Sequence, residues 1–225
     1  MLRVRQIYYK EIQKVINMER TRNFVPYYNP ISDETLESGV IRRLFEEGDY
    51  KSSEYYGVLS HKFYKKLKKD SNYIENTILN DEDKADVYSF FGNLTKTNLI
   101  TQGNNWHPLF VDIYKVIANR LDWDIDLEDN KALMQPIYSN HWIASKETFK
   151  EFCLDFLIPV TDLMRESKLL RDLCYQDANY ISREKISPEN CLKVFNKPYY
   201  TYHCFILERL FPLFCYLRNK TVKHI

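Results

Sequence analysis

An alternating acidic run, Asp122-Trp123-Asp124-Ile125-Asp126, is the clearest candidate for metal chemistry in the sequence. In an extended segment alternate side chains point to one side, so these carboxylates could share a cation. Carboxylate oxygens suit Mn²⁺ or Mg²⁺, whereas the glycine that a calcium loop needs is absent. The residues therefore suggest Asp122 and Asp124 as ligands of Mn²⁺ or Mg²⁺. The alternative is an acidic, solvated loop that ends the preceding helix.

A second candidate is the pair Glu208 and Arg209, which interrupts the apolar segment 202–217. A buried ion needs a partner, because leaving it unpaired costs several kcal/mol. One interpretation makes Glu208 a general base and Arg209 a contact for a diphosphate. The other is a buried ion-pair network that ties the last helix to the core.

Ser60, His61 and Lys62 stand between a predicted strand and a basic helical segment. Backbone N–H groups at a helix start and the Lys62 ammonium could bind phosphate. Ligands of open α/β sheets also collect at the carboxyl ends of strands. We therefore expect these residues to bind substrate, with an exposed turn on a basic surface helix as the alternative.

Two histidines, His107 and His141, each lie next to a tryptophan in the sequence. His107 is a candidate substrate contact, although a lone histidine is more often a hydrogen-bonded structural residue. Asn140 could bind a sugar hydroxyl while Trp142 stacks on the sugar ring.

The elements that must position these residues follow from the hydrophobic pattern. Strands are predicted at 4–9, 55–59, 85–91 and 137–144, and helices at 33–47, 63–69, 109–121, 145–160 and 202–217. Gly48 is expected to end the first helix, Ser145 to cap the fourth and Pro159 to bend it. Short strands alternating with helices predict one layered α/β domain over residues 1–225.

The amino-acid composition argues against some classes of function. The 225 residues hold 32 Lys and Arg against 31 Asp and Glu, and this balance argues against nucleic acid as a partner. The five glycines form neither a GxGxxG nor a GxxxxGK pattern, which excludes the common nucleotide-binding loops.

Localisation is also bounded by the sequence. The five cysteines form no CxxC pair, as expected for reduced, buried thiols in a cytoplasmic protein. We see neither a signal-peptide core nor a membrane-length apolar run. Lys220, Lys223 and His224 could still rest on an anionic membrane at its inner face, although a solvated C-terminus is the simpler interpretation.

Four segments occur in an order that resembles bacterial capsule and exopolysaccharide glycosyltransferases. They are YYGVLSHKFY at 55–64, ADVY at 85–88, YSNHWIA at 138–144 and HCFILERLF at 203–211, with QGNNWHP at 102–108 similar to related polysaccharide-cluster proteins. The segment at 60–62 lacks the paired arginines of those proteins. The resemblance implies a GT-A-like nucleotide-diphospho-sugar transferase fold with a mixed central sheet flanked by helices.

The same resemblance implies a function. The chain would transfer a sugar from a nucleotide-sugar donor to a growing capsule or lipopolysaccharide, on a glycan or lipid-linked acceptor. Asp86 and Glu208 would be the catalytic carboxylates, and Ser60, Asp86, Asn140 and Glu208 would line one cleft. The alternative is a non-catalytic glycan-binding or assembly partner of a polysaccharide-synthesis complex.

Overall fold

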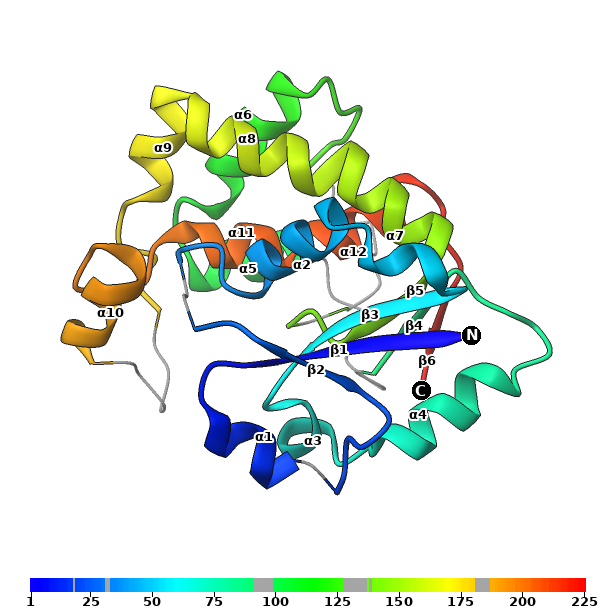
Figure 1. Ribbon diagram of the computed structural model, residues 1–225. Coiled ribbons are helices and arrows are strands. Elements are labelled where there is room, and N and C mark those ends of the chain that lie inside the picture. The colour runs from blue at the N-terminus through cyan, green and yellow to red at the C-terminus, as the bar shows by residue number, and fades with distance from the viewer. Residues whose placement is uncertain (18, 31–32, 91–98, 128–136, 138, 181–186) are drawn as a thin grey trace.

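The protein is described by a computed structural model covering residues 1–225, except 18, 31–32, 91–98, 128–136, 138 and 181–186. It is an α/β structure with a mixed six-stranded sheet whose strand order is β2-β1-β3-β5-β4-β6. Helices cover both faces of this sheet (Figure 1). The predicted α/β class and mixed sheet are therefore confirmed.

One strand runs against all its neighbours. The strands are β1 (Leu2–Tyr8), β2 (Val25–Tyr28), β3 (Tyr55–Ser60), β4 (Val87–Ser89), β5 (Trp142–Ser145) and β6 (Val222–His224). β1 pairs in parallel with both β2 and β3, and β4 pairs in parallel with β6. β5 is antiparallel to β3 and to β4, so the carboxyl ends of the other five strands lie at one edge.

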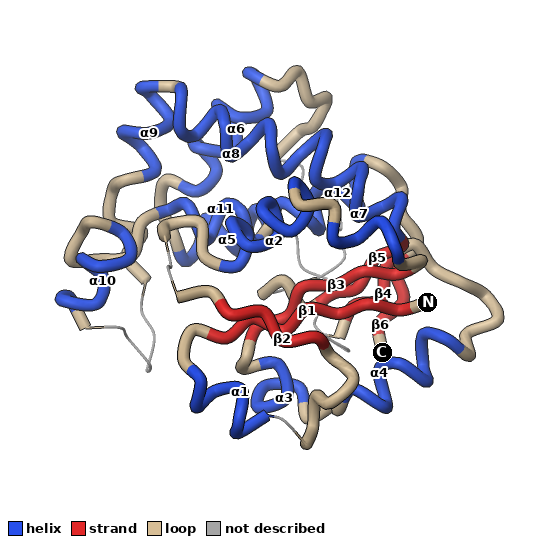
Figure 2. Tube along the Cα trace, in the orientation of Figure 1, coloured by secondary structure: helices blue, strands red, loops and turns tan. Residues whose placement is uncertain are grey.

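The helices form two unequal layers (Figure 2). Beneath the sheet lie α1 (Glu11–Asn17), α3 (Phe63–Leu67) and α4 (Ser71–Leu79). Above it lie α2 (Glu37–Glu46), α5 (Leu99–Trp106), α6 (Phe110–Arg120), α7 (Lys146–Phe152), α8 (Ile158–Glu166), α9 (Lys168–Cys174), α11 (Tyr202–Glu208) and α12 (Leu210–Leu217). α10 (Pro188–Phe195) extends to the side of the sheet.

Each layer has its own hydrophobic core, and β3 serves both. Tyr56 and Val58 belong to the larger core above the sheet, whereas Tyr55 and Leu59 belong to the smaller core below it. Alternation along the strand places these pairs on opposite faces. Ser60 follows in the register of Tyr56 and Val58, so it ends the strand on the upper side. All five cysteines are buried free thiols, as predicted.

Several predicted elements are confirmed with shifted ends. The first two strands, the helices at 63–69 and 109–121 and the Ser145 cap, which accepts from the Thr148 N–H, are present. The helix predicted from residue 33 starts only at Glu37, and left-handed Gly48 follows its end. The strands predicted at 85–91 and 137–144 shorten to β4 and β5, and residues 91–93 lie outside the described part.

Pro159 does not simply bend the helix that contains it. A π-helical turn, Cys153–Leu157, joins α7 to α8, and Pro159 stands in the first turn of α8. A proline cannot donate to the carbonyl four residues before it, here that of Asp155. The π-turn changes the hydrogen-bond register at that point, so the chain continues as a helix.

The last predicted helix is broken in two at the residues of greatest interest. α11 ends at Glu208 and α12 begins at Leu210, with Arg209 between them. Pro212 explains the break, because it has no N–H for the Glu208 carbonyl and its ring would clash with that group. The break places Glu208 and Arg209 at a helix junction instead of inside a continuous helix.

Strand pairing and two ion pairs attach the C-terminal segment to the rest of the molecule. β6 pairs with β4, Lys220 Nζ lies 2.6 Å from Glu151 and Lys223 Nζ lies 2.7 Å from Asp81. These cations are held by carboxylates of the same chain. Within the described residues, none of the helices has the length and apolar character to cross a bilayer.

Candidate functional site

The sheet reverses its winding direction around β1. β1 lies between β2 and β3, and the two connections run on opposite faces, through α1 below the sheet and α2 above it. Such a reversal opens a crevice outside the carboxyl ends of the strands, where ligands of α/β sheets bind. Ser60, at the carboxyl end of β3, stands at this crevice.

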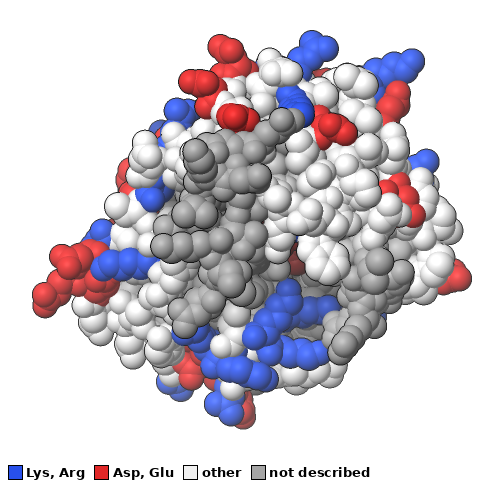
Figure 3. Space-filling model, turned by 180° about the vertical axis from the view of Figure 1, so that it is seen from behind, with Lys and Arg blue, Asp and Glu red and all other residues white. Residues whose placement is uncertain are grey.

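A cleft of about 180 Å³ occupies this position, and we call it the carboxylate cleft. Its walls come from distant segments: the start of α2, the end of β3, α3, the turn before β5 and α11. Its polar lining is Thr35, Glu37, Ser38, Ser60, Lys66, Ser139, Asn140 and Glu208. Three of the four residues predicted to share one cleft, Ser60, Asn140 and Glu208, are therefore together. Figure 3 shows a dense group of Lys and Arg side chains beside a hollow on this side of the molecule.

Two carboxyl groups line the cleft, and the charge of Glu208 acts on Glu37. The backbone N–H of Ser139 donates to Glu208 Oε1 at 2.7 Å, and the Ser139 hydroxyl lies 3.1 Å from the same oxygen. Burial raises the pKa of Glu37 above its usual range, and the charge of Glu208 raises it further, while Lys66 and Lys62 oppose this rise. A carboxyl with a raised pKa beside an anchored carboxylate is suited to acid–base catalysis.

The backbone around the cleft is strained. Leu36, Ser139 and Asn140 have φ angles of 49°, 55° and 52°, in the left-handed region that non-glycine residues rarely adopt. Leu36 directly precedes Glu37, and Ser139 is the residue that holds Glu208. Conformations of this kind cost about 1–3 kcal/mol each and cluster at functional sites. The strained residues here set the position of both carboxylates.

A second pocket, of about 320 Å³, adjoins the cleft, and we call it the Arg209 pocket. The two share Ser139, Tyr180, Phe205 and Glu208 as lining residues. Gln102, Trp106, His107 and Arg209 complete the second pocket. Glu208 thus lines both hollows.

Arg209 is a buried cation with neutral partners. Its side chain is in a residue only 7% exposed, and it donates to the Phe205 carbonyl at 3.3 Å and to Gln102 Oε1 at 3.2 Å. Its guanidinium carbon lies 5.1 Å from the centre of the Phe110 ring, and its Nε has no hydrogen-bond partner among the residues that the structure describes. In the described part of the chain no carboxylate forms an ion pair with Arg209, so the expected ion-pair network is not present there. A buried guanidinium that lacks a carboxylate partner is suited to binding an anionic ligand.

His107 forms the floor of the same pocket. Its ring is stacked on Phe205 at 4.0 Å between centroids, and its Nδ1 lies 2.6 Å from the Ala178 carbonyl oxygen. Because a carbonyl only accepts, Nδ1 carries the proton. Burial lowers the pKa of His107, and the charge of Arg209 lowers it further, against the Ala178 bond and Glu208. His107 therefore presents a neutral ring to the pocket.

Other predicted site residues lie elsewhere. Asp86 is at the opposite end of the sheet, where it accepts from the Thr221 N–H and hydroxyl at 2.8 Å each. Its assignment as a catalytic carboxylate in this cleft is wrong. Trp142 is 1% exposed and stacked on Phe211 at 3.5 Å, so neither face of its ring is open to a sugar.

His61 and Lys62 border the cleft without lining it. The His61 ring packs against Tyr9, and its Nε2 lies 3.3 Å from Gln13 Nε2, on the α1 side. Burial lowers the pKa of His61 to about 4, helped by Lys62 and Lys66. Lys62 is exposed and acts on Glu37 through its charge.

Asp122 and Asp124 lie after α6 in a different hollow, with Trp123, Asp155 and Arg218. Among the residues with described positions, no three His, Cys, Asp or Glu side chains converge as metal ligands. The pair has no further ligand of this kind among the described residues, and its assignment to Mn²⁺ or Mg²⁺ stays a prediction. It is distant in the fold from the two hollows around Glu208.

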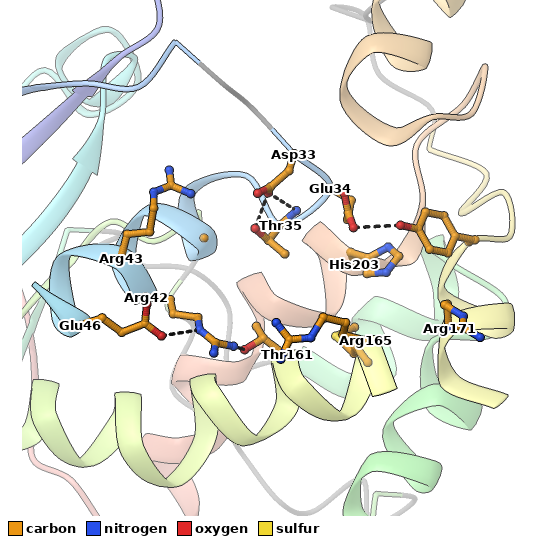
Figure 4. A pocket seen from close by; sticks show the side chains of 13 residues that line it. Asp33, Glu34, Thr35, Arg42, Arg43, Glu46, Thr161, Arg165, Arg171 and His203 are labelled. Carbon is orange, nitrogen blue, oxygen red and sulfur yellow. Dashed lines mark hydrogen bonds and ion pairs between the residues drawn. The ribbon is translucent and has the colours of Figure 1, made fainter. Parts of the chain in front are cut away.

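A cavity of about 470 Å³ lies on the other side of the loop that contains Thr35 (Figure 4). Its charged groups are largely paired. Arg42 bonds to Glu46 at 2.8 Å and to Asp162 at 2.6 Å, and Tyr175 donates to Glu34 at 2.9 Å. Arg165, Arg171 and His203 face the same space. The lining is polar and of mixed charge, which suits a neutral polar ligand better than a polyanion.

Glu37 is the residue that the sequence alone did not reveal. It stands in the first turn of a helix, where acidic residues are common because they complement the helix dipole. Because this role is common, the sequence alone does not indicate that Glu37 belongs to a site. Its placement opposite Glu208 depends on the strained Leu36 and on the helix break at Arg209, which no local pattern reveals.

The chain was compared with protein-family models, curated proteins and solved structures. None of these comparisons finds a match. The site is therefore interpreted from its own geometry.

Proposed function

We propose that the chain is a glycosyltransferase with a GT-A-like nucleotide-diphospho-sugar fold. It would transfer a sugar from a nucleotide-sugar donor to a growing capsule or lipopolysaccharide at the inner face of the membrane. The proposal combines the sequence resemblance with one observation. Two carboxyl groups and a buried arginine, which has no carboxylate partner among the described residues, line two adjoining hollows near the carboxyl edge of the sheet.

The proposed reaction uses these groups as follows. The acceptor hydroxyl oxygen attacks the anomeric carbon, and the bond from that carbon to the diphosphate breaks with its electron pair on the diphosphate. Glu37 accepts the hydroxyl proton, since its raised pKa brings it closer to neutral pH. The Ser139 N–H holds the Glu208 carboxyl group in place, where it would support positive charge on the sugar. Arg209, with Lys62 and Lys66 nearby, neutralises the leaving diphosphate.

The acceptor has a separate route to Glu37. Thr35 lines both the carboxylate cleft and the cavity of Figure 4. The paired charges of that cavity and the ring of Tyr175 are the groups that bind sugar hydroxyls and sugar faces. We assign this cavity to the glycan acceptor, which would leave the Arg209 pocket to the donor.

Calorimetric titration with UDP, GDP and CMP sugars, with and without Mn²⁺, tests the donor site. We expect one of these donors to bind, and Arg209→Met to weaken that binding about 100-fold, the cost of removing a buried charge contact. Asp86→Asn, at the far end of the sheet, is the matched control and should bind as the parent does. Absence of binding to every donor would contradict the donor assignment.

A non-catalytic glycan-binding role is the second candidate. It shares the acceptor cavity but needs no proton acceptor. Retention of glycan by the parent and by Glu37→Gln, with no sugar transfer by the parent in the presence of a bound donor, is the result that supports this role.

A further inference from the structure

Helix α1 exposes its aliphatic side chains to solvent. Ile12, Val15 and Ile16 are 59%, 57% and 72% exposed, and their spacing places them on one face of the helix. Within the helix, Asn17 Nδ2 donates to the Gln13 carbonyl at 2.7 Å. Three aliphatic side chains that are exposed on one short helix lose the free energy that burial in the core would provide.

A group of lysines lies next to this aliphatic face. Lys62, Lys65, Lys66, Lys68 and Lys69 occupy α3 and its two ends within eight positions, and all but half-buried Lys69 are exposed. The dense basic patch beside the hollow in Figure 3 lies over this part of the molecule.

Two contacts join α1 and its following turn to α3. Gln13 Nε2 lies 3.3 Å from His61 Nε2, and the Arg20 guanidinium lies 5.5 Å from the centre of the Tyr64 ring. Figure 1 also shows α1 and α3 next to each other beneath the sheet. The aliphatic face and the lysines therefore belong to one surface.

We infer that α1 and α3 form a docking surface for an anionic lipid bilayer. The aliphatic side chains would enter the boundary between headgroups and acyl chains while the lysines contact acidic headgroups. Nucleic acid offers the lysines a partner but leaves the aliphatic face without one. The inference stands independently of the proposed reaction.

The position of the surface has a consequence for access to the site. Lys66 lines the carboxylate cleft and also belongs to the basic group. Docking through α3 would therefore bring the opening of the cleft close to the bilayer.

Co-sedimentation with vesicles tests the inference. We expect the full chain to bind vesicles of phosphatidylcholine containing about one-third phosphatidylglycerol, to bind pure phosphatidylcholine far less, and to dissociate as salt is raised. Ile12→Ser with Ile16→Ser should weaken binding about tenfold, through lost apolar burial. Lys65→Glu with Lys68→Glu should weaken it about 30-fold or more.

The matched control is Leu192→Ser with Lys193→Glu on α10, an exposed leucine and lysine far from this surface, which should bind as the parent does. Thermal unfolding of each variant shows that the fold is retained. Equal binding to neutral vesicles, no binding to either, or binding unchanged by the isoleucine variant would overturn the inference. Tight binding to single-stranded RNA without vesicle binding would overturn it in favour of nucleic acid.

Discussion

Acidic side chains at the two ends of the sheet have pKa values that are shifted in opposite directions. Towards the amino ends of β1 and β3, Asp49 accepts from Arg3 at 2.7 Å, from Arg5 at 2.8 Å and from the Tyr56 hydroxyl at 2.7 Å. Burial alone would raise the pKa of Asp49, but these bonds and charges outweigh it and lower the pKa to about 2. At the carboxyl edge, burial and Glu208 raise the pKa of Glu37 instead.

This difference separates a structural carboxylate from a candidate catalytic one. Asp49 accepts hydrogen bonds from Arg3, Arg5 and Tyr56, so its negative charge contributes to stability. Glu37 lies in a cleft with a like charge nearby, so its negative charge costs stability and is available for proton transfer. The same contrast applies to Arg5, which pairs with Asp49, and Arg209, whose partners among the described residues are all neutral.

The largest expected effect concerns activity. Glu37→Gln removes the proposed proton acceptor and should lower the rate of sugar transfer by about 10²–10⁴-fold, while donor affinity stays within a few-fold. Asp86→Asn is the control at the opposite end of the sheet and should keep the parental rate. The rates come from a radiolabelled transfer assay. A Glu37→Gln variant with the parental rate would remove Glu37 from the mechanism.

The next effect concerns stability. Asp49→Asn leaves Arg3 and Arg5 without their carboxylate and should lower the free energy of unfolding by about 2–3 kcal/mol. The lowered pKa means that this stabilisation is present above the unfolded-state pKa of 3.8 and is lost as pH falls towards about 2. Urea unfolding of parent and variant should therefore converge at acidic pH. A constant gap at every pH would contradict the ion-pair explanation.

A smaller change in stability, in the direction opposite to that of Asp49→Asn, is expected for a substitution of Arg209. Arg209→Met removes a buried cation that has no carboxylate partner among the described residues, so the variant should unfold at the parental temperature or higher. Arg5→Met is the comparison variant. Because it leaves Asp49 with one partner fewer, it should unfold at a lower temperature than the parent. Differential scanning fluorimetry decides between them. Equal destabilisation by both variants would indicate that Arg209 is structural.

The smallest effect is the pH dependence at Glu37. Its pKa is raised in the fold, so ionising it costs free energy of folding. The cost is absent below the unfolded-state pKa of 4.5, where the carboxyl is protonated in both states, and complete above the folded-state pKa. Glu37→Gln should therefore raise the unfolding temperature by about 1–3 °C near pH 8 and leave it unchanged near pH 3. The reverse dependence would mean that the fold favours the charged form.

Much of the fold could be predicted from local patterns. The alternation in β1 and β3, the stripe of α6 and the Ser145 cap depend on a few neighbouring residues, and all are present. The break at Arg209 was missed because one proline, Pro212, outweighed a strongly apolar pattern. The late start of α2 was missed because Asp33 forms a local turn instead of starting the helix: its carboxylate accepts from the Thr35 N–H at 2.9 Å and its carbonyl accepts from the Leu36 N–H at 3.1 Å.

The site was predicted less completely. Ser60, Asn140 and Glu208 were identified as polar residues at strand ends or within apolar segments, and the fold brings them together. Asp86 also stands at a strand, but at its amino end, and the sequence does not show that this strand runs parallel to β3, which places Asp86 at the opposite edge of the sheet. Trp142 follows Asn140 by two residues, yet it belongs to β5 and its ring is committed to the core.

The central claim is that Glu37 and Glu208 act on each other across one cleft. Carbon-detected NMR titration of the Glu37 carboxyl, assigned by comparison with Glu37→Gln, measures this directly. We predict that Glu37 titrates above its ordinary value of 4.5 and that Glu208→Gln lowers its pKa. A Glu37 carboxyl that titrates at or below that value, with no response to Glu208→Gln, would contradict the account.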